Sequence, residues 1–68
     1  MRYAIVIEKA NGNYSAYVHD LPGCIATGKT LADVPRELRK AIRFHLDGLR
    51  EDGLPVPRPA TKAEYVEA

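Results

Sequence analysis

The sequence of 68 residues has very few of the residues that stabilise small proteins through cross-links. Its only cysteine, Cys24, excludes an internal disulfide bond, and one cysteine with two histidines argues against a structural zinc site. Folding at this size buries only about 60% of the surface of the unfolded chain, so a monomer is expected to be marginally stable. We therefore expect the chain to be stabilised by oligomerisation or by a tightly bound partner.

A strong charge imbalance and a long hydrophobic run are also absent. Ten basic and nine acidic residues give a net charge of +1, whereas a nucleic-acid module of this size is usually much more basic. No apolar run approaches the roughly 20 residues that span a bilayer, and the first residues lead straight into a strand-like pattern rather than a signal peptide. Together with the free thiol, these features predict one cytoplasmic domain over residues 1–68, without a membrane segment.

Three short segments have the composition of β-strands joined by tight turns. Residues 2–8 are β-branched and aromatic with apolar side chains on both faces, which predicts a central strand. Asn11-Gly12, two residues that accept positive φ, predicts a hairpin into a second strand over residues 14–19. Pro22-Gly23 predicts a type II turn into a third strand over residues 24–27. The segments together predict an antiparallel meander.

The second half of the chain predicts one helix and an extended exit. Thr30 has the position of an N-cap with Asp33 reaching back, and apolar residues spaced by three and four continue to Leu49. We expect this helix to end near residue 52, with Gly53 just beyond it, and Pro35 either to distort its first turn or to move its start to about Val34. The proline-rich residues 54–60 predict an extended connector, and residues 63–67 a weak last strand.

The predicted fold class is therefore α+β, with the order β-β-β-α-β. The last strand is expected to lie parallel to the first, giving the spatial order 3-2-1-4 with the helix on one face of the sheet. The other face then has no cover within the chain. We expect a second copy of the chain to pack there, which predicts a homodimer or higher homo-oligomer.

Several segments resemble the HicB-like antitoxin family. The resemblance covers residues 3–59 and rests on Tyr14-Ser15-Ala16-Tyr17-Val18, Asp20-Leu21-Pro22-Gly23-Cys24, the Thr30 helix start, the helix around His45 and Gly53-Leu54-Pro55-Val56-Pro57. It implies a partial RNase H-like fold that binds and masks a small HicA-type, mRNA-cleaving toxin, with no cofactor, metal site or catalysis of its own. The resemblance gives structural roles to Asp20, Leu21, Pro22, Gly23, Cys24, Thr30 and His45. Longer relatives carry a C-terminal DNA-binding segment, and no such segment follows within these 68 residues.

Five residues are candidates for contact with a partner protein. Phe44 lies off the apolar stripe of the predicted helix, beside Gly48, and Arg43 belongs to the exposed helix side. Pro57 lies in the extended connector. Tyr65 and Val66 belong to the last strand, which as an edge strand could pair with another chain.

Two rival interpretations concern catalysis, and a third concerns nucleic acid. Cys24 could act as a nucleophile with His19 as its base, but a small buried hydrophobic residue is the favoured interpretation. Glu8 and Asp20 could lie together at a hairpin end and contribute to a metal cluster, but nothing supplies a full set of ligands. The alternative function is a small nucleic-acid-binding module using the basic helix side, which comprises Arg36, Arg39, Lys40, Arg43 and Arg50.

Overall fold

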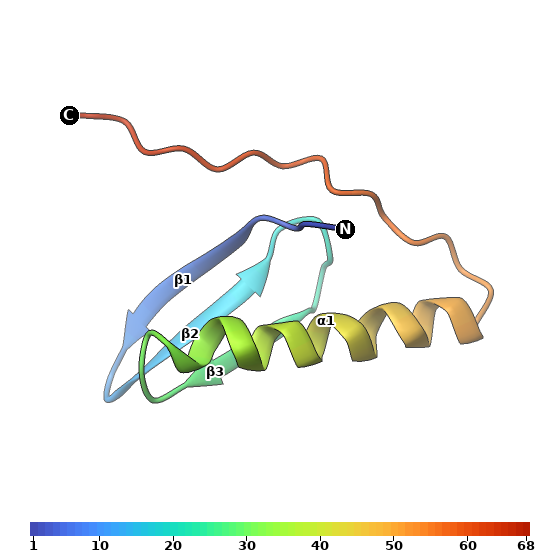
Figure 1. The fold of residues 1–68 in the computed structure, drawn as a ribbon, viewed down its shortest axis with the longest axis horizontal. Coiled ribbons are helices and arrows are strands. Elements are labelled where there is room, and N and C mark those ends of the chain that lie inside the picture. The colour runs from blue at the N-terminus through green and yellow to red at the C-terminus, as the bar shows by residue number, and fades with distance from the viewer.

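The computed structural model describes all 68 residues and contains one sheet and one helix (Figure 1). Strands β1 (Ile5–Ala10), β2 (Asn13–Val18) and β3 (Ile25–Gly28) form an antiparallel sheet in the order β1-β2-β3. Helix α1 (Asp33–Glu51) follows and covers one face of β2 and β3. The predicted α+β class, the antiparallel meander and the single helix are confirmed. Helix α1 is neither long enough nor apolar enough to cross a membrane.

Both strand connections are tight turns, as the sequence predicts. Asn11 and Gly12 form the two-residue loop between the paired residues Ala10 and Asn13, but only Gly12 has a positive φ, 77°. The hairpin predicted at Asn11-Gly12 is therefore confirmed, with Gly12 alone at positive φ. The second turn is confirmed, because Gly23 has φ 82° and the Cys24 N–H donates to the Leu21 carbonyl over 3.0 Å.

Both ends of α1 follow from local sequence. The prediction that Thr30 is the N-cap is wrong, because the helix begins at Asp33 and Ala32 is at the N-cap position. The Thr30 hydroxyl accepts a hydrogen bond from the Asp33 N–H at 3.2 Å and so closes the turn before the helix. Pro35 is the third helical residue, where no backbone N–H has an intrahelical partner, so it fits without a lost bond. At the other end Gly53 has φ 69°, and the N–H groups of Gly53 and Leu54 bond to the carbonyls of Arg50 and Leu49. This is a Schellman ending.

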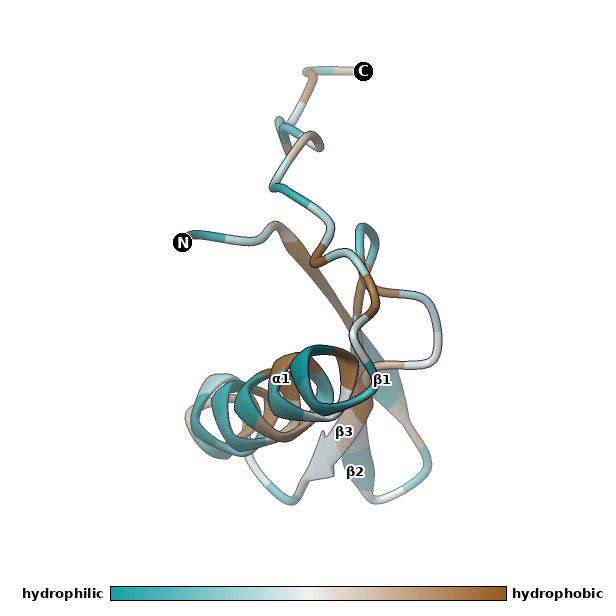
Figure 2. Cartoon of the chain, turned by 90° about the vertical axis from the view of Figure 1, so that its right-hand side faces the viewer, coloured by the Kyte–Doolittle hydropathy of each residue, from teal (hydrophilic) through white to brown (hydrophobic).

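The core is small and lies between α1 and the inner face of the sheet. The strand register places Ile5 opposite Val18 and Ile7 opposite Ala16, so their side chains share the face that α1 covers. In Figure 2 the apolar stripe of α1 turns toward this face. Seven residues are buried: Ala16, Val18, Leu21, Cys24, Val34, Leu38 and Leu46. The core therefore links the meander, the Leu21–Cys24 turn and one stripe of the helix.

The sheet differs from the prediction at β1. The strand begins at Ile5 rather than Arg2 and pairs only with β2, so it is an edge strand and not a central one. The second apolar face of β1 belongs to the outer face of the sheet, away from α1. There Val6 lies opposite Tyr17, and Tyr17 lies opposite Ile25, so three apolar side chains form a row across the strands. These side chains are 37%, 39% and 67% exposed. No part of the chain covers this face, as was expected.

The predicted C-terminal strand is absent. Residues 54–68 are extended but form no ladder, so the order 3-2-1-4 is wrong for the isolated chain, and the RNase H-like architecture stays a prediction. Pro55, Pro57 and Pro59 have no N–H to donate to β1. The N–H groups of the next two residues, Ala60 and Thr61, are bound by a side chain instead of a strand. The segment runs in the same direction as β1 but diverges from it (Figure 1).

Candidate protein-binding surfaces

Asp20 fastens the C-terminal segment to the sheet. Its Oδ2 accepts hydrogen bonds from the backbone N–H groups of Ala60 and Thr61, both at 3.0 Å, and its Oδ1 accepts the Thr61 hydroxyl at 2.7 Å. Nearby, the Tyr3 hydroxyl donates to the Pro57 carbonyl over 2.5 Å. We call these two attachments the latch. They fix the connector beside the start of β1.

The hydrogen bonds to Asp20 stabilise its ionised form. The Thr61 hydroxyl first, and then the N–H groups of Ala60 and Thr61, stabilise the carboxylate and hold the pKa of Asp20 below its ordinary value of 3.8. Because the pKa is lower with the latch closed than with it open, the latch is at full strength above the ordinary pKa. The attachment made by Asp20 is lost as the pH falls through the lowered value.

The latch can be tested through the amides that it binds. In Asp20→Ala, the side chain has no acceptor, so the hydrogen bonds from the N–H groups of residues 60 and 61 are lost. We expect the amide proton shifts of Ala60 and Thr61 to move toward open-chain values at neutral pH. In the parent protein we expect the same change only in acid. Amide shifts that are unchanged in Asp20→Ala would contradict the latch.

A groove lies between the N-terminal segment and α1. It has a volume of about 510 Å³ and an apolar floor made mainly of Tyr3, Ile5 and the helix residues Leu38, Ile42 and Leu46. Four arginines form its rim: Arg2, Arg39, Arg43 and Arg50. No carboxylate lines it. We call this feature the arginine groove.

Ion pairs divide the basic residues of α1 into two sets. Arg36 pairs with Asp33, and Lys40 pairs with Glu37. The Arg50 Nη1 lies 3.6 Å from the Asp47 Oδ1, so this pair is also within the helix. Arg2, Arg39 and Arg43 form no ion pair within the chain. Three of the basic residues that have no ion pair therefore line the arginine groove, whereas Lys9, Lys29 and Arg58 are not part of it.

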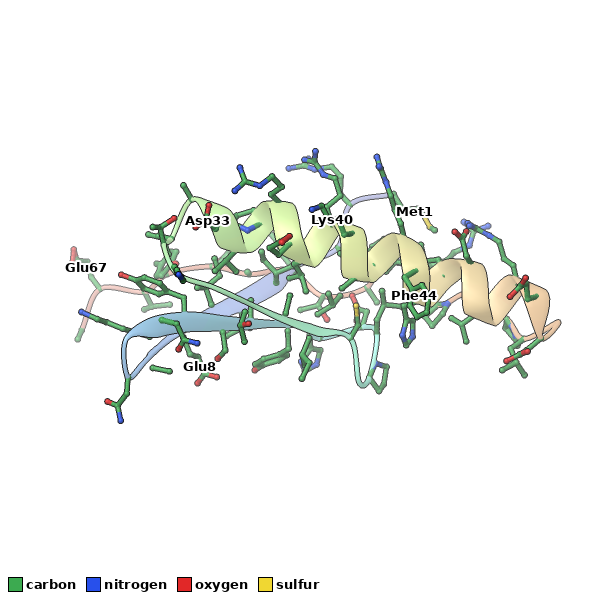
Figure 3. All side chains as sticks on the ribbon, turned by 90° about the horizontal axis from the view of Figure 1, so that it is seen from below. Met1, Glu8, Asp33, Lys40, Phe44 and Glu67 are labelled. Carbon is green, nitrogen blue, oxygen red and sulfur yellow. The ribbon has the colours of Figure 1, made fainter.

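Phe44 lies on a different side of α1. It is 83% exposed, and a Cβ built on Gly48, one turn further along the helix, would meet no atom within 4 Å. Figure 3 shows Phe44 on α1, while Glu8 projects from the sheet on the opposite side of the molecule. Phe44 is thus an aromatic protrusion beside an open stretch of helix backbone.

The residues of the motif around the second turn have structural positions. Leu21 and Cys24 are buried, and Pro22-Gly23 forms the turn between them. Burial raises the pKa of the Cys24 thiol, so the reactive thiolate is disfavoured, and the thiol forms no hydrogen bond with His19. His45 is half-buried on α1, and its imidazole ring makes no hydrogen bond within the chain. The position of Cys24 is therefore that of a core residue.

The prediction that Glu8 and Asp20 lie together at a hairpin end is wrong. Glu8 pairs with Ser15 in the ladder, whereas Asp20 follows Val18, which lies opposite Ile5 near the other end of β1. The chain contains no group of three His, Cys, Asp or Glu residues close enough to hold a metal ion.

The five predicted partner residues do not form one surface. Arg43 lines the arginine groove, Phe44 faces away from the core, and Pro57 belongs to the latch. Tyr65 and Val66 lie on the extended segment and are 105% and 88% exposed. The sequence analysis missed the latch and the role of Arg2, because both depend on contacts between residues far apart in the chain.

Comparisons with known proteins agree with this architecture. The family model of HicB-like antitoxins of bacterial toxin–antitoxin systems matches residues 3–68. An uncharacterized 14.9 kDa protein of Haemophilus phage HP1 is 38% identical over 66 residues, which are 97% of this chain but half the length of the phage protein. A UPF0150 protein of Thermoplasma acidophilum is 34% identical over 69 residues, the full length of both chains.

A solved structure of a toxin–antitoxin complex also contains a chain that resembles this one. One chain of a HicA3 and HicB3 toxin–antitoxin complex matches with a TM-score of 0.78 and 32% identity, covering 88% of this chain and 70% of that chain. The matched region includes the meander and the helix that carry the resemblance in sequence. The chain belongs to the family of HicB-like antitoxins of bacterial toxin–antitoxin systems.

Proposed function

We propose that this chain binds a HicA-type toxin and masks its mRNA-cleaving site, without catalysis of its own. The observation that carries the proposal is the likeness, over most of the chain, to a solved structure of a HicA–HicB complex. Masking requires a complementary surface rather than a reactive group, and the exposed features described above are apolar or charged. We expect the complex to act in the cytoplasm, where mRNA is translated.

The side of α1 around Phe44 is the contact surface that we propose for the toxin. Exposed aromatic side chains are enriched among the residues that dominate binding energy at protein interfaces. Phe44 is the most exposed large apolar residue within a helix or strand of this chain, and Gly48 leaves room for a partner to approach the helix backbone. An aromatic anchor beside a flat area suits a protein partner better than a small molecule.

The proposal is tested by finding whether a HicA-type toxin is encoded beside the chain and producing the two proteins together. We expect the two proteins to purify as one complex and the toxin's arrest of growth to be relieved. Persistent growth arrest, with no complex recovered although both proteins are made, would show that the chain does not act as the antitoxin of this toxin.

A further inference from the structure

The chain exposes more surface than a compact protein of its mass. Its accessible surface is 5607 Å², whereas a monomer of 7.5 kDa is expected to expose about 4,250 Å². Its radius of gyration is 13.0 Å, against about 11 Å for a compact domain of this length. The excess exceeds the roughly 800 Å² that each partner buries in a stable interface. This surface is large enough to support association.

The C-terminal segment contributes to this excess. We call residues 62–68 the tail. Tyr65 and Val66 contact nothing that covers them, and Glu64 pairs only with the exposed Lys62, at 3.2 Å. Glu64 and Glu67 are three residues apart, so in a polyproline II conformation they share one side and leave the other sides to Tyr65 and Val66. The tail therefore offers acidic and apolar groups on separate sides.

The arginine groove has the complementary character. Arg2, Arg39 and Arg43 have no carboxylate partner, and the floor of the groove is apolar. A nucleic-acid backbone would satisfy the arginines but would leave the floor without an apolar partner. An acidic segment with apolar side chains would satisfy both. Helix residues 35–50 extend over about 22 Å, which matches the reach of about 23 Å for seven extended residues.

The tail is kept away from the groove of its own chain. The latch holds Pro57, Ala60 and Thr61, and the residues that follow lie beside Arg2, Tyr3 and Ala4, on the side away from α1. The N-terminal segment thus separates the tail from α1, and Figures 1 and 2 both show this arrangement. A tail that fills a groove must then come from another molecule.

We propose that the tail of one chain occupies the arginine groove of a second copy, and that two chains exchange tails reciprocally in a homodimer. Glu64 and Glu67 meet the arginines of the partner copy, and Tyr65 and Val66 cover its apolar floor. The latch presents the tail for this exchange. The interaction concerns self-association and does not depend on toxin binding.

Charge reversal on each side tests the exchange with full-length protein. The tail variant carries Glu64→Lys and Glu67→Lys, and the groove variant carries Arg39→Glu and Arg43→Glu, all at exposed positions. Circular dichroism verifies that both variants fold. In sedimentation velocity over a dilution series, we expect the parent chain to dimerise and each variant to dissociate at concentrations about tenfold higher or more, because like charges then face each other.

Mixing provides the decisive control. The tail variant keeps an intact groove, and the groove variant keeps an intact tail, so an equimolar mixture should form a heterodimer that contains one parental tail–groove pair and one pair with both charges reversed. A chain carrying all four substitutions should regain self-association. Dimers that persist unchanged in both variants would overturn the proposal in favour of another interface, such as the outer face around Tyr17. A monomeric parent chain would also overturn it.

A single-stranded RNA oligonucleotide serves as the competing probe. If RNA binds the parent chain and the tail variant equally but not the groove variant, while no variant changes self-association, the groove is an RNA site and the tail exchange is wrong. None of these readouts involves the toxin. Failure of the exchange is therefore distinguishable from failure of the proposed antitoxin function.

Discussion

Replacing Leu21 with alanine is expected to unfold most of the isolated chain. Leu21 is fully buried, and its side chain fills the core from the turn between β2 and β3. Removing a buried leucine side chain costs about 2 to 5 kcal/mol, while the core of so small a domain rarely supplies more than about 3 to 5 kcal/mol. Circular dichroism with urea denaturation should show loss of the cooperative transition or a large decrease in its midpoint.

Leu31→Ala is the matched control, because Leu31 is the same residue type but is 56% exposed. We expect its free energy of unfolding to change by less than about 0.5 kcal/mol. If Leu21→Ala were as stable as Leu31→Ala, the structural role assigned to the motif around the second turn would be incorrect.

Replacing Phe44 with alanine is expected to weaken toxin binding by about 30-fold or more, which is the effect of losing a central aromatic anchor. The same change should leave the chain folded, because Phe44 packs against no part of the core and alanine favours the helix. Binding is measured by calorimetry with a catalytically inactive toxin, and folding is measured in parallel by circular dichroism.

Tyr17→Ala provides the control for this second substitution. Tyr17 is an exposed aromatic residue on the outer face of the sheet, opposite the face that α1 covers. We expect Tyr17→Ala to bind the toxin as the parent chain does. The reverse result, in which Tyr17→Ala loses binding and Phe44→Ala retains it, would show that the toxin binds the outer face of the sheet.

Elements fixed by neighbouring residues could be predicted from the sequence. Gly23 and Gly53 mark a type II turn and a helix end, and both adopt the positive φ that those structures need. The apolar residues from Val34 to Leu46 recur at helical spacing, and the same residues form the helix side of the core. Each of these features depends on contacts within a few residues or on simple periodicity.

Features that depend on distant contacts could not be predicted. Whether β1 is central depends on the last segment of the chain, and there the prolines and the hydrogen bonds to Asp20 prevent strand pairing. Asp20 and Thr61 are 41 residues apart, and no local pattern connects them. The strand propensity of residues such as Tyr65 and Val66 indicates that the backbone can be extended, but it does not identify a neighbouring strand for the segment to pair with.

The candidate surfaces were predicted only in part. Periodicity assigned five basic residues to one exposed side of the helix, but the structure divides them. Arg36 and Lys40 are paired on the helix, whereas Arg39 and Arg43 join Arg2 at the groove. This division depends on where the N-terminal segment lies. The exposure of Phe44, by contrast, follows from its position off the apolar stripe, and the structure agrees.

The most direct test of the account is inhibition of RNA cleavage by the purified toxin. A HicA-type toxin that forms a complex with this chain is incubated with an mRNA substrate and increasing amounts of the chain, with Phe44→Ala as the comparison. Masking predicts that cleavage stops near a one-to-one ratio of the two proteins, and that Phe44→Ala requires a large excess. Cleavage that continues at full rate in the presence of excess folded chain would contradict the account.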